Sequence, residues 1–131
     1  MTGERDLSRV QSDMAPQMHS ETFVYCNFPD FEIPPGMSPI CTFREAEGLT
    51  VIVEKGQAEH RAVEYVFEAR LITLTVHSSL EAVGFLAALA GSLAQASMPC
   101  NAVAGYHHDH LFVPTARAGE AFALLSAMAS P

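Results

Sequence analysis

Alternating apolar and polar residues predict the strands of this chain. Residues 70–76 show the clearest pattern, because Ile72, Leu74 and Val76 alternate with polar residues and give a strand one apolar and one mixed face. Other segments are rich in β-branched and aromatic residues and are bounded by residues typical of turns. These further predicted strands are residues 22–28, 40–44, 49–54, 100–106 and 111–113.

Apolar residues spaced three and four apart predict helices between the strands. The longest helix is expected from Ser78 to about Ala96, with Ser78 and Glu81 as a reciprocal capping box that satisfies amide groups at the helix start. Alanines and a glycine along this helix are expected to let it lie close against a sheet. Residues 57–65 predict a short helix, and Thr115 is expected to cap a final one.

An internal repeat organises these elements. The segments "FREAEGLTVIV" (43–53) and "VAGYHHDHLFV" (103–113) have equal length, and each is followed by a short polar link and a predicted helix. The repeated module is therefore strand, tight turn, strand, link, helix. A strand and the long helix precede the second copy, which gives the β-α-β-β-α order of ferredoxin-like folds. In the first copy the Pro-rich residues 29–36 stand where that helix would be.

The sequence thus predicts an α+β protein with antiparallel sheets and helices on one face. We expect a flexible or short helical N-terminal segment over residues 1–19, a degenerate first half over 20–65, and a complete ferredoxin-like βαββα half over 66–131. A glycine, Gly48, is expected to supply a positive φ in the first hairpin turn.

Composition narrows the class of protein. The chain has 131 residues, of which 49% are hydrophobic and 17% are charged, enough for one core or two small, mutually dependent lobes. Its net charge of -8 and lack of a basic cluster argue against nucleic acid as a partner. The longest apolar stretch, residues 82–91, is short for a membrane helix, and the first residues lack a signal-peptide core. We expect a cytoplasmic protein without a membrane partner.

The residues from Leu74 to Pro114, "LTVHSSLEAVGFLAALAGSLAQASMPCNAVAGYHHDHLFVP", resemble the ACT domain, a small ligand-sensing βαββαβ module. The resemblance extends over about residues 20–128 and is strongest to a small bacterial family built from tandem ACT-like halves of uncharacterised function. In the ACT family, domains associate in pairs and bind amino acids or similar effectors at the interface. The loop after the first strand and the start of the second strand contact the effector.

The resemblance implies an effector site in the second half of this chain. Amide donors at a helix start suit a carboxylate, and hydroxyl and amide side chains offer oriented hydrogen bonds. The serines could equally serve only as helix caps, and the asparagine could satisfy its own backbone. The implied ligand-binding residues are His77, Ser78, Ser79, Leu80, Val83, Gly84 and Asn101.

The run His107-His108-Asp109-His110 lies between two predicted strands and could bind a metal or simply turn the chain. In an extended segment His108 and His110 point to one side while the other two residues point away, which divides the cluster. The matching slot of the first copy is a turn without histidine. A turn role explains both copies, so we favour it.

Cysteine and aromatic residues add little chemistry. Cys26, Cys41 and Cys100 are odd in number and form no C-x-x-C pair, so we expect buried, reduced side chains rather than disulfides or a zinc site. Tyr106 and Phe112, near the histidine turn, are expected to be packing residues rather than part of a binding site.

The sequence therefore predicts a non-enzymatic sensor of a small molecule, an amino acid by the family resemblance, with no cofactor. Exposed strand edges favour a homodimer. Two alternatives stay open at this point: an assembly module that binds a partner protein and no effector, and a small metal-dependent enzyme that uses His107–His110.

Overall fold

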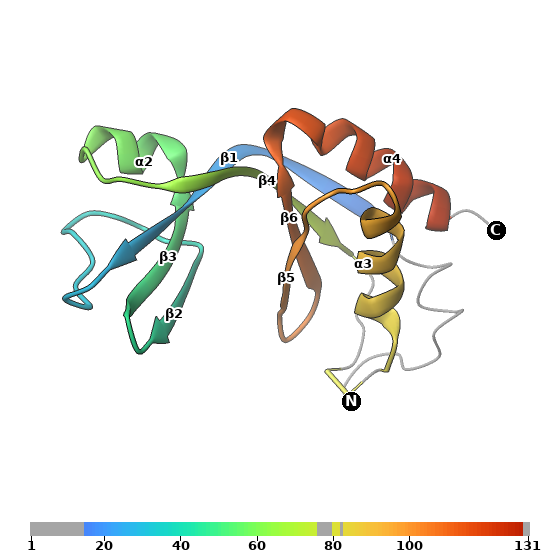
Figure 1. The fold of residues 1–131 in the computed structure, drawn as a ribbon, viewed down its shortest axis with the longest axis horizontal. Helices are drawn as coiled ribbons and strands as arrows, with labels where there is room; N and C mark the ends of the chain where they lie inside the picture. The colour runs from blue at the N-terminus through green and yellow to red at the C-terminus, as the bar shows by residue number, and fades with distance from the viewer. Residues whose placement is uncertain (1–14, 76–79, 82, 130–131) are drawn as a thin grey trace. The chain divides into compact units, whose positions relative to one another are not determined.

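The computed structural model describes residues 15–75, 80–81 and 83–129. Their strands form a six-stranded sheet with the order β2-β3-β1-β4-β6-β5 (Figure 1). The chain divides into two compact units, and we call Glu21–Ala69 the first unit. The second unit joins the described residues up to Ser20 with those from Arg70 onward. Strands β1 (Pro16–Phe28) and β4 (Val66–Leu74) each contribute residues to both units.

The first unit is a hairpin and a short helix added to β1. The hairpin strands are β2 (Cys41–Glu45) and β3 (Gly48–Glu54), and α2 (Lys55–His60) follows them. Strand β3 lies between β2 and β1 and is antiparallel to both. Alternate residues of β1 and β3 pack with α2 because strand side chains alternate between faces. The buried core of this unit is Val24, Cys26, Met37, Leu49, Val51, Val53 and Ala58.

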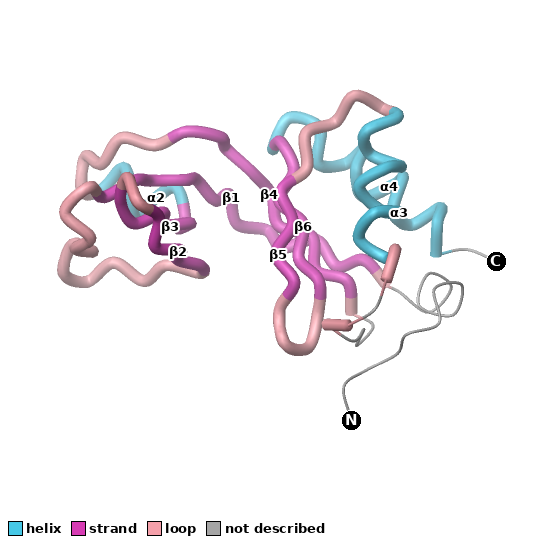
Figure 2. The backbone as a smooth tube through the Cα atoms, turned by 60° about the horizontal axis from the view of Figure 1, so that its bottom comes forward, coloured by secondary structure: helices cyan, strands magenta, loops and turns pink. Residues whose placement is uncertain are grey.

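The second unit carries two longer helices on its strands. Helix α3 (Phe85–Gln95) leads to the hairpin of β5 (Asn101–Ala104) and β6 (Asp109–Pro114). A 3₁₀ turn, Thr115–Arg117, then leads into α4 (Ala118–Ala129). Both helices lie on one side of the strands of this unit (Figure 2). The buried core that they share with the strands is Ile72, Leu74, Phe85, Leu89, Leu93, Met98, Leu111, Val113, Ala118, Ala121 and Leu125.

The predicted repeat is confirmed by strand register. Phe43 pairs with Thr50 in the first hairpin, and Val103 pairs with His110 in the second. Each residue pair of the second hairpin, from Asn101–Phe112 to Ala104–Asp109, has its counterpart at the same place of the first hairpin. The predicted absence of a helix after β1 is also confirmed, since residues 29–40 contain turns and irregular backbone but no helix.

Gly48 occupies a crowded position at the start of β3. Its φ is 154°, and a Cβ atom there would lie 2.5 Å from Oδ1 of Asn27 and 3.0 Å from the carbonyl oxygen of Phe28. Glycine therefore allows β3 to approach the end of β1 closely, as well as supplying the expected positive φ.

The long helix starts later than predicted. Its N-cap is Gly84, which has a left-handed φ of 91°. A right-handed helix cannot continue through a residue in this conformation. Glu81 lies before the helix and Ser78 lies outside the described residues, so the predicted capping box does not start α3. Leu80 and Val83 are 61% and 86% exposed rather than buried on the helix.

Most of the small residues of α3 face away from the sheet, contrary to our prediction. Phe85, Leu89 and Leu93 are buried at a spacing of four, which sets the packed face of the helix. The four small residues on the exposed face are Ala87, Ala90, Gly91 and Ala94.

Other boundaries also differ from the sequence prediction. Strand β1 begins at Pro16 rather than at residue 22, and α2 ends at His60 because the amide of Val63 turns back to the carbonyl of Ala58 (2.9 Å). Thr115 does not cap the last helix: it begins the 3₁₀ turn, whose N-cap is Pro114, and its buried hydroxyl has no hydrogen-bond partner among the described residues.

Two predictions about single side chains are also wrong. Cys26 is buried, but Cys41 and Cys100 are partly exposed; all three are free thiols. Tyr106 is 72% exposed in the turn between β5 and β6, whereas Phe112 is buried as predicted. No helix of the described residues is long and apolar enough to cross a membrane.

Candidate functional site

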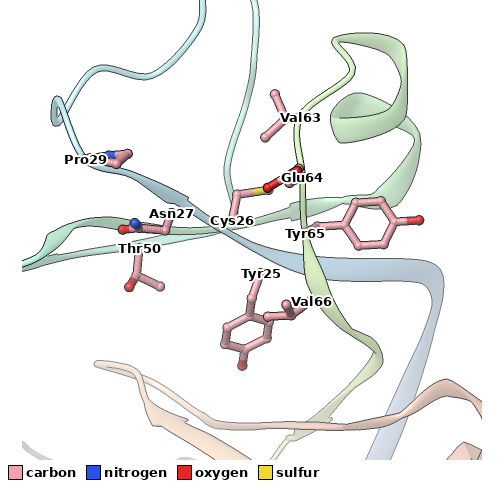
Figure 3. A pocket seen from close by; sticks show the side chains of 9 residues that line it. All are labelled: Tyr25, Cys26, Asn27, Pro29, Thr50, Val63, Glu64, Tyr65 and Val66. Carbon is pink, nitrogen blue, oxygen red and sulfur yellow. The ribbon is translucent and has the colours of Figure 1, made fainter.

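An open groove of about 860 Å³ lies in the first unit. Its walls come from the second half of β1, from β3, and from the segment that leads into β4 (Figure 3). The volume is within the usual range of small-molecule sites. The lining residues are Tyr25, Cys26, Asn27, Pro29, Thr50, Val63, Glu64, Tyr65 and Val66.

The groove lies beside the second half of β1, next to residues 63–65, which precede β4 and are not part of the sheet. Residues 63–65 are irregular, and β4 starts only at Val66. The next residue, Phe67, has a left-handed φ of 58°, which is uncommon for a bulky side chain and bends the backbone as β4 begins. The Phe67 ring packs edge-on against the Tyr25 ring, with centroids 5.6 Å apart, and so fixes one wall of the groove.

The lining combines apolar side chains with a few polar groups. Cys26 is buried, and burial raises the pKa of its thiol, which keeps the sulfur protonated and weakly polar at neutral pH. Asn27 offers an amide and Thr50 a hydroxyl, although that hydroxyl already donates to Glu45. Tyr65 turns its hydroxyl to Oε2 of Glu59 on α2, at 3.3 Å.

Charge in the groove has one sign. Among the described lining residues, Glu64 carries the single charge, and neither lysine nor arginine is present. An apolar wall with one carboxylate and few hydrogen-bonding groups can hold a small organic molecule and orient it.

The effector residues implied by the family resemblance lie in the second unit, and none of them lines the groove. His77, Ser78 and Ser79 fall outside the described residues. Leu80 and Val83 are exposed before α3, and Gly84 is its N-cap. Asn101 is exposed at the start of β5, opposite Phe112 on β6. This site remains a prediction.

The histidine run lies only partly in a turn: His107 and His108 belong to the turn, whereas Asp109 and His110 belong to β6 and pair with β5. The amide of Gly105 donates to the carbonyl of His108 at 2.8 Å, and β6 begins at Asp109. Within the described ranges no group of three or more His, Cys, Asp or Glu side chains could hold a metal ion. His107 packs edge-on against Tyr106, with ring centroids 4.9 Å apart.

His110 takes part in a contact that the sequence did not predict. Its Nδ1 lies 3.0 Å from the hydroxyl of Thr73 on β4, and the same hydroxyl lies 2.9 Å from Nε2 of His19 on β1. Burial is the main cause that lowers the pKa of His110, and the charge of His108 adds to it. The contact joins three strands of the second unit and favours neutral His110.

The fold and the repeated hairpin define an α+β protein of tandem ferredoxin-like halves. Residues 2–70 match one ACT domain family and residues 66–127 match another. The chain belongs to the ACT domain family, and a regulatory role through small-molecule binding is the class of function that this membership supports.

Solved structures agree with this assignment. A protein of unknown function from Vibrio cholerae, described as a possible transport protein, is 40% identical, with a TM-score of 0.81 over 92% of this chain and 93% of that chain. A protein from Agrobacterium tumefaciens is 12% identical, with a TM-score of 0.74 over 89% of this chain and 90% of that one.

The regulatory subunit of aspartate kinase from Thermus flavus is similar over 98% of this chain and 99% of that chain. It is 7% identical, with a TM-score of 0.57, so the likeness concerns the fold alone. A comparison with curated proteins found no significant match.

Proposed function

We propose that this protein is a non-enzymatic cytoplasmic sensor that binds an amino acid or a closely related small molecule and regulates a partner. The observation that carries the proposal is the groove of the first unit, which has the volume and the mainly apolar lining of a ligand site. Membership in the ACT family supports the regulatory part of the proposal.

A second site in the second unit is part of the proposal. The loop His77–Leu80, the following residues Val83 and Gly84, and Asn101 at the start of β5 would form it, as the family resemblance implies. The exposure of Asn101 is consistent with contact to an effector.

Calorimetric titration of the whole protein against the twenty amino acids tests the proposal. Saturable heat from at least one of them is the expected result, and the absence of heat from all twenty would overturn it. Ser79→Ala and Asn101→Ala together should abolish the part of the signal that belongs to the second unit while leaving the fold intact. Unchanged titrations for every binding amino acid would remove the second-unit site from the proposal.

The proposed assembly is a homodimer. Strand β2 lies at the edge of the sheet order, and Phe43 at its centre is 70% exposed. Unpaired edge strands are usually covered by another chain or protected by charge. Light scattering that gives the mass of a single chain at micromolar concentration would contradict a dimer.

The exposed edge also favours the alternative function, an assembly module that binds another protein and no effector. Copurification separates the two functions, because the assembly module requires a stoichiometric partner and gives no heat with small molecules. The sensor is expected to give heat in isolation.

A further inference from the structure

We propose that the groove of the first unit selects primary amines that carry an apolar body, with the carboxylate of Glu64 as the group that holds the ammonium. The inference rests on the proposed small-molecule function and specifies the chemistry of one site. It also gives the degenerate half of the chain a binding role of its own, although that half lacks the helix that normally follows its first strand.

Charge complementarity carries the first step. Glu64 is exposed, lines the groove and makes no ion pair or hydrogen bond within the described part of the chain. A carboxylate ligand would find no lysine or arginine among the described lining residues. An ammonium group would find an unpaired carboxylate and could form a charge-assisted hydrogen bond with it.

The nearby cationic side chains, Lys55 and Arg61, do not pair with the Glu64 carboxylate because each has other partners. Lys55 pairs with Glu68 at 2.8 Å. The guanidinium of Arg61 donates to the carbonyl oxygens of Pro35 (3.2 Å) and Gln57 (3.5 Å). Glu64 thus remains available to a ligand while its neighbours are engaged.

The remaining lining residues explain why the bound amine should carry an apolar body. Cys26, Val63 and Val66 present aliphatic or weakly polar surface, and burying such surface of a ligand is favourable in proportion to its area. The Tyr25 ring, steadied by Phe67, adds an aromatic surface that attracts both apolar groups and a nearby cation. An amine with a hydrocarbon or aromatic body would satisfy both parts of the groove.

Two matched probes test the choice of charge on the whole protein. Phenethylamine and 3-phenylpropionate share the ring and the two-carbon chain but carry opposite charges, and 2-phenylethanol is the neutral equivalent. Calorimetry or chemical-shift titration should show binding of the amine that is about tenfold tighter than that of the alcohol, and no binding of the acid. Equal affinity for all three probes, or preference for the acid, would overturn the inference.

A pair of variants then tests the residue. Glu64→Gln keeps the shape of the side chain and removes its charge, so it should weaken phenethylamine binding about tenfold. Glu47→Gln, which alters an exposed acid in the turn between β2 and β3 outside the groove, should leave it unchanged. Circular dichroism checks that each variant is folded. If a variant unfolds, the comparison of the three probes on the native chain still tests the preference of the groove for amines. Equal affinity of Glu64→Gln and the native chain would overturn the role of Glu64.

The outcomes separate this inference from the proposed function. If amino acids bind but the amine probe does not, the inference fails and the sensor remains. If neither the amino acids nor any probe binds, both fail.

Discussion

The hydroxyl oxygen of Thr73 lies 3.0 Å from Nδ1 of His110, which stands on another strand of the second unit. The same oxygen also meets Nε2 of His19, at 2.9 Å. A hydroxyl has a single proton to donate and two lone pairs that accept, so at most one imidazole accepts the Thr73 proton, and the other then donates its own N–H to the oxygen. Because the pKa of His110 is lowered, we expect His110 to be the acceptor and His19 the donor.

Acid should destabilise the fold through His110. Its folded pKa lies below the ordinary value of 6.5, with burial as the main cause, His108 and His19 adding to it and Asp109 opposing it. The unfolded chain therefore binds this proton more readily, so stability is full above about pH 6.5 and declines as pH falls toward the folded pKa. Urea unfolding between pH 8 and pH 5 should show this decline.

A matched variant isolates the effect of His110. The variant His110→Asn should show a shallower decline of the free energy of unfolding over the same pH range. Parallel curves for His110→Asn and the native chain would contradict the expected role of His110.

Removing the Thr73 hydroxyl should disturb both histidines. Thr73→Val keeps the shape of this buried side chain but leaves the two imidazoles without their shared partner, at a cost of about 1–2 kcal/mol. It should also raise the pKa of His110, because neutral His110 loses the hydrogen bond that it accepts. Urea unfolding gives the first quantity and an NMR titration of the imidazole protons gives the second. Thr73→Ser retains the hydroxyl and should change either value much less.

Two glycines should respond in opposite directions to alanine. Gly48→Ala places a Cβ atom against Asn27 and Phe28, at a φ that side chains rarely adopt, and should destabilise the fold by about 1–3 kcal/mol. Gly91 lies inside α3 with nothing within 4 Å of a new Cβ, so Gly91→Ala should stabilise it by about 0.5–1 kcal/mol. Thermal unfolding of the two variants checks both signs.

The start of α3 can be tested by side-chain truncation. Leu89 is fully buried in the second core, so Leu89→Ala should cost about 2–5 kcal/mol. Val83 precedes the helix and is largely exposed, so Val83→Ala should change stability by less than about 0.5 kcal/mol. A large loss for Val83→Ala would mean that the helix extends back to this residue, as the sequence pattern had predicted.

The hairpins were predictable from the sequence because their signals are local. The β-branched residues of 49–54 and the equal spacing of the two modules locate β3, β6 and their partners. The helix start was not predictable in this way. Ser78 and Glu81 satisfy the local capping pattern, yet the left-handed backbone of Gly84 places the helix N-cap at that residue.

The groove was less predictable than the fold. The Pro-rich segment indicated that a helix was missing, which is the one sequence signal that points to open space beside β1. The groove also depends on positive φ values at Ala62 and Phe67, which are non-glycine residues whose conformation comes from tertiary packing. The contact between Thr73 and two histidines distant in sequence likewise arises only when three strands assemble.

Because β1 and β4 each supply residues to both units, no single cut of the gene would release either unit whole. A fragment that starts at Val66 would keep α3, α4 and the second hairpin but would lose His19 and the rest of β1. Interleaving of this kind makes the two ACT-like halves unsuitable for exchange as separate cassettes. Grafting experiments should therefore transfer the whole of β1 and the whole of β4 along with either unit.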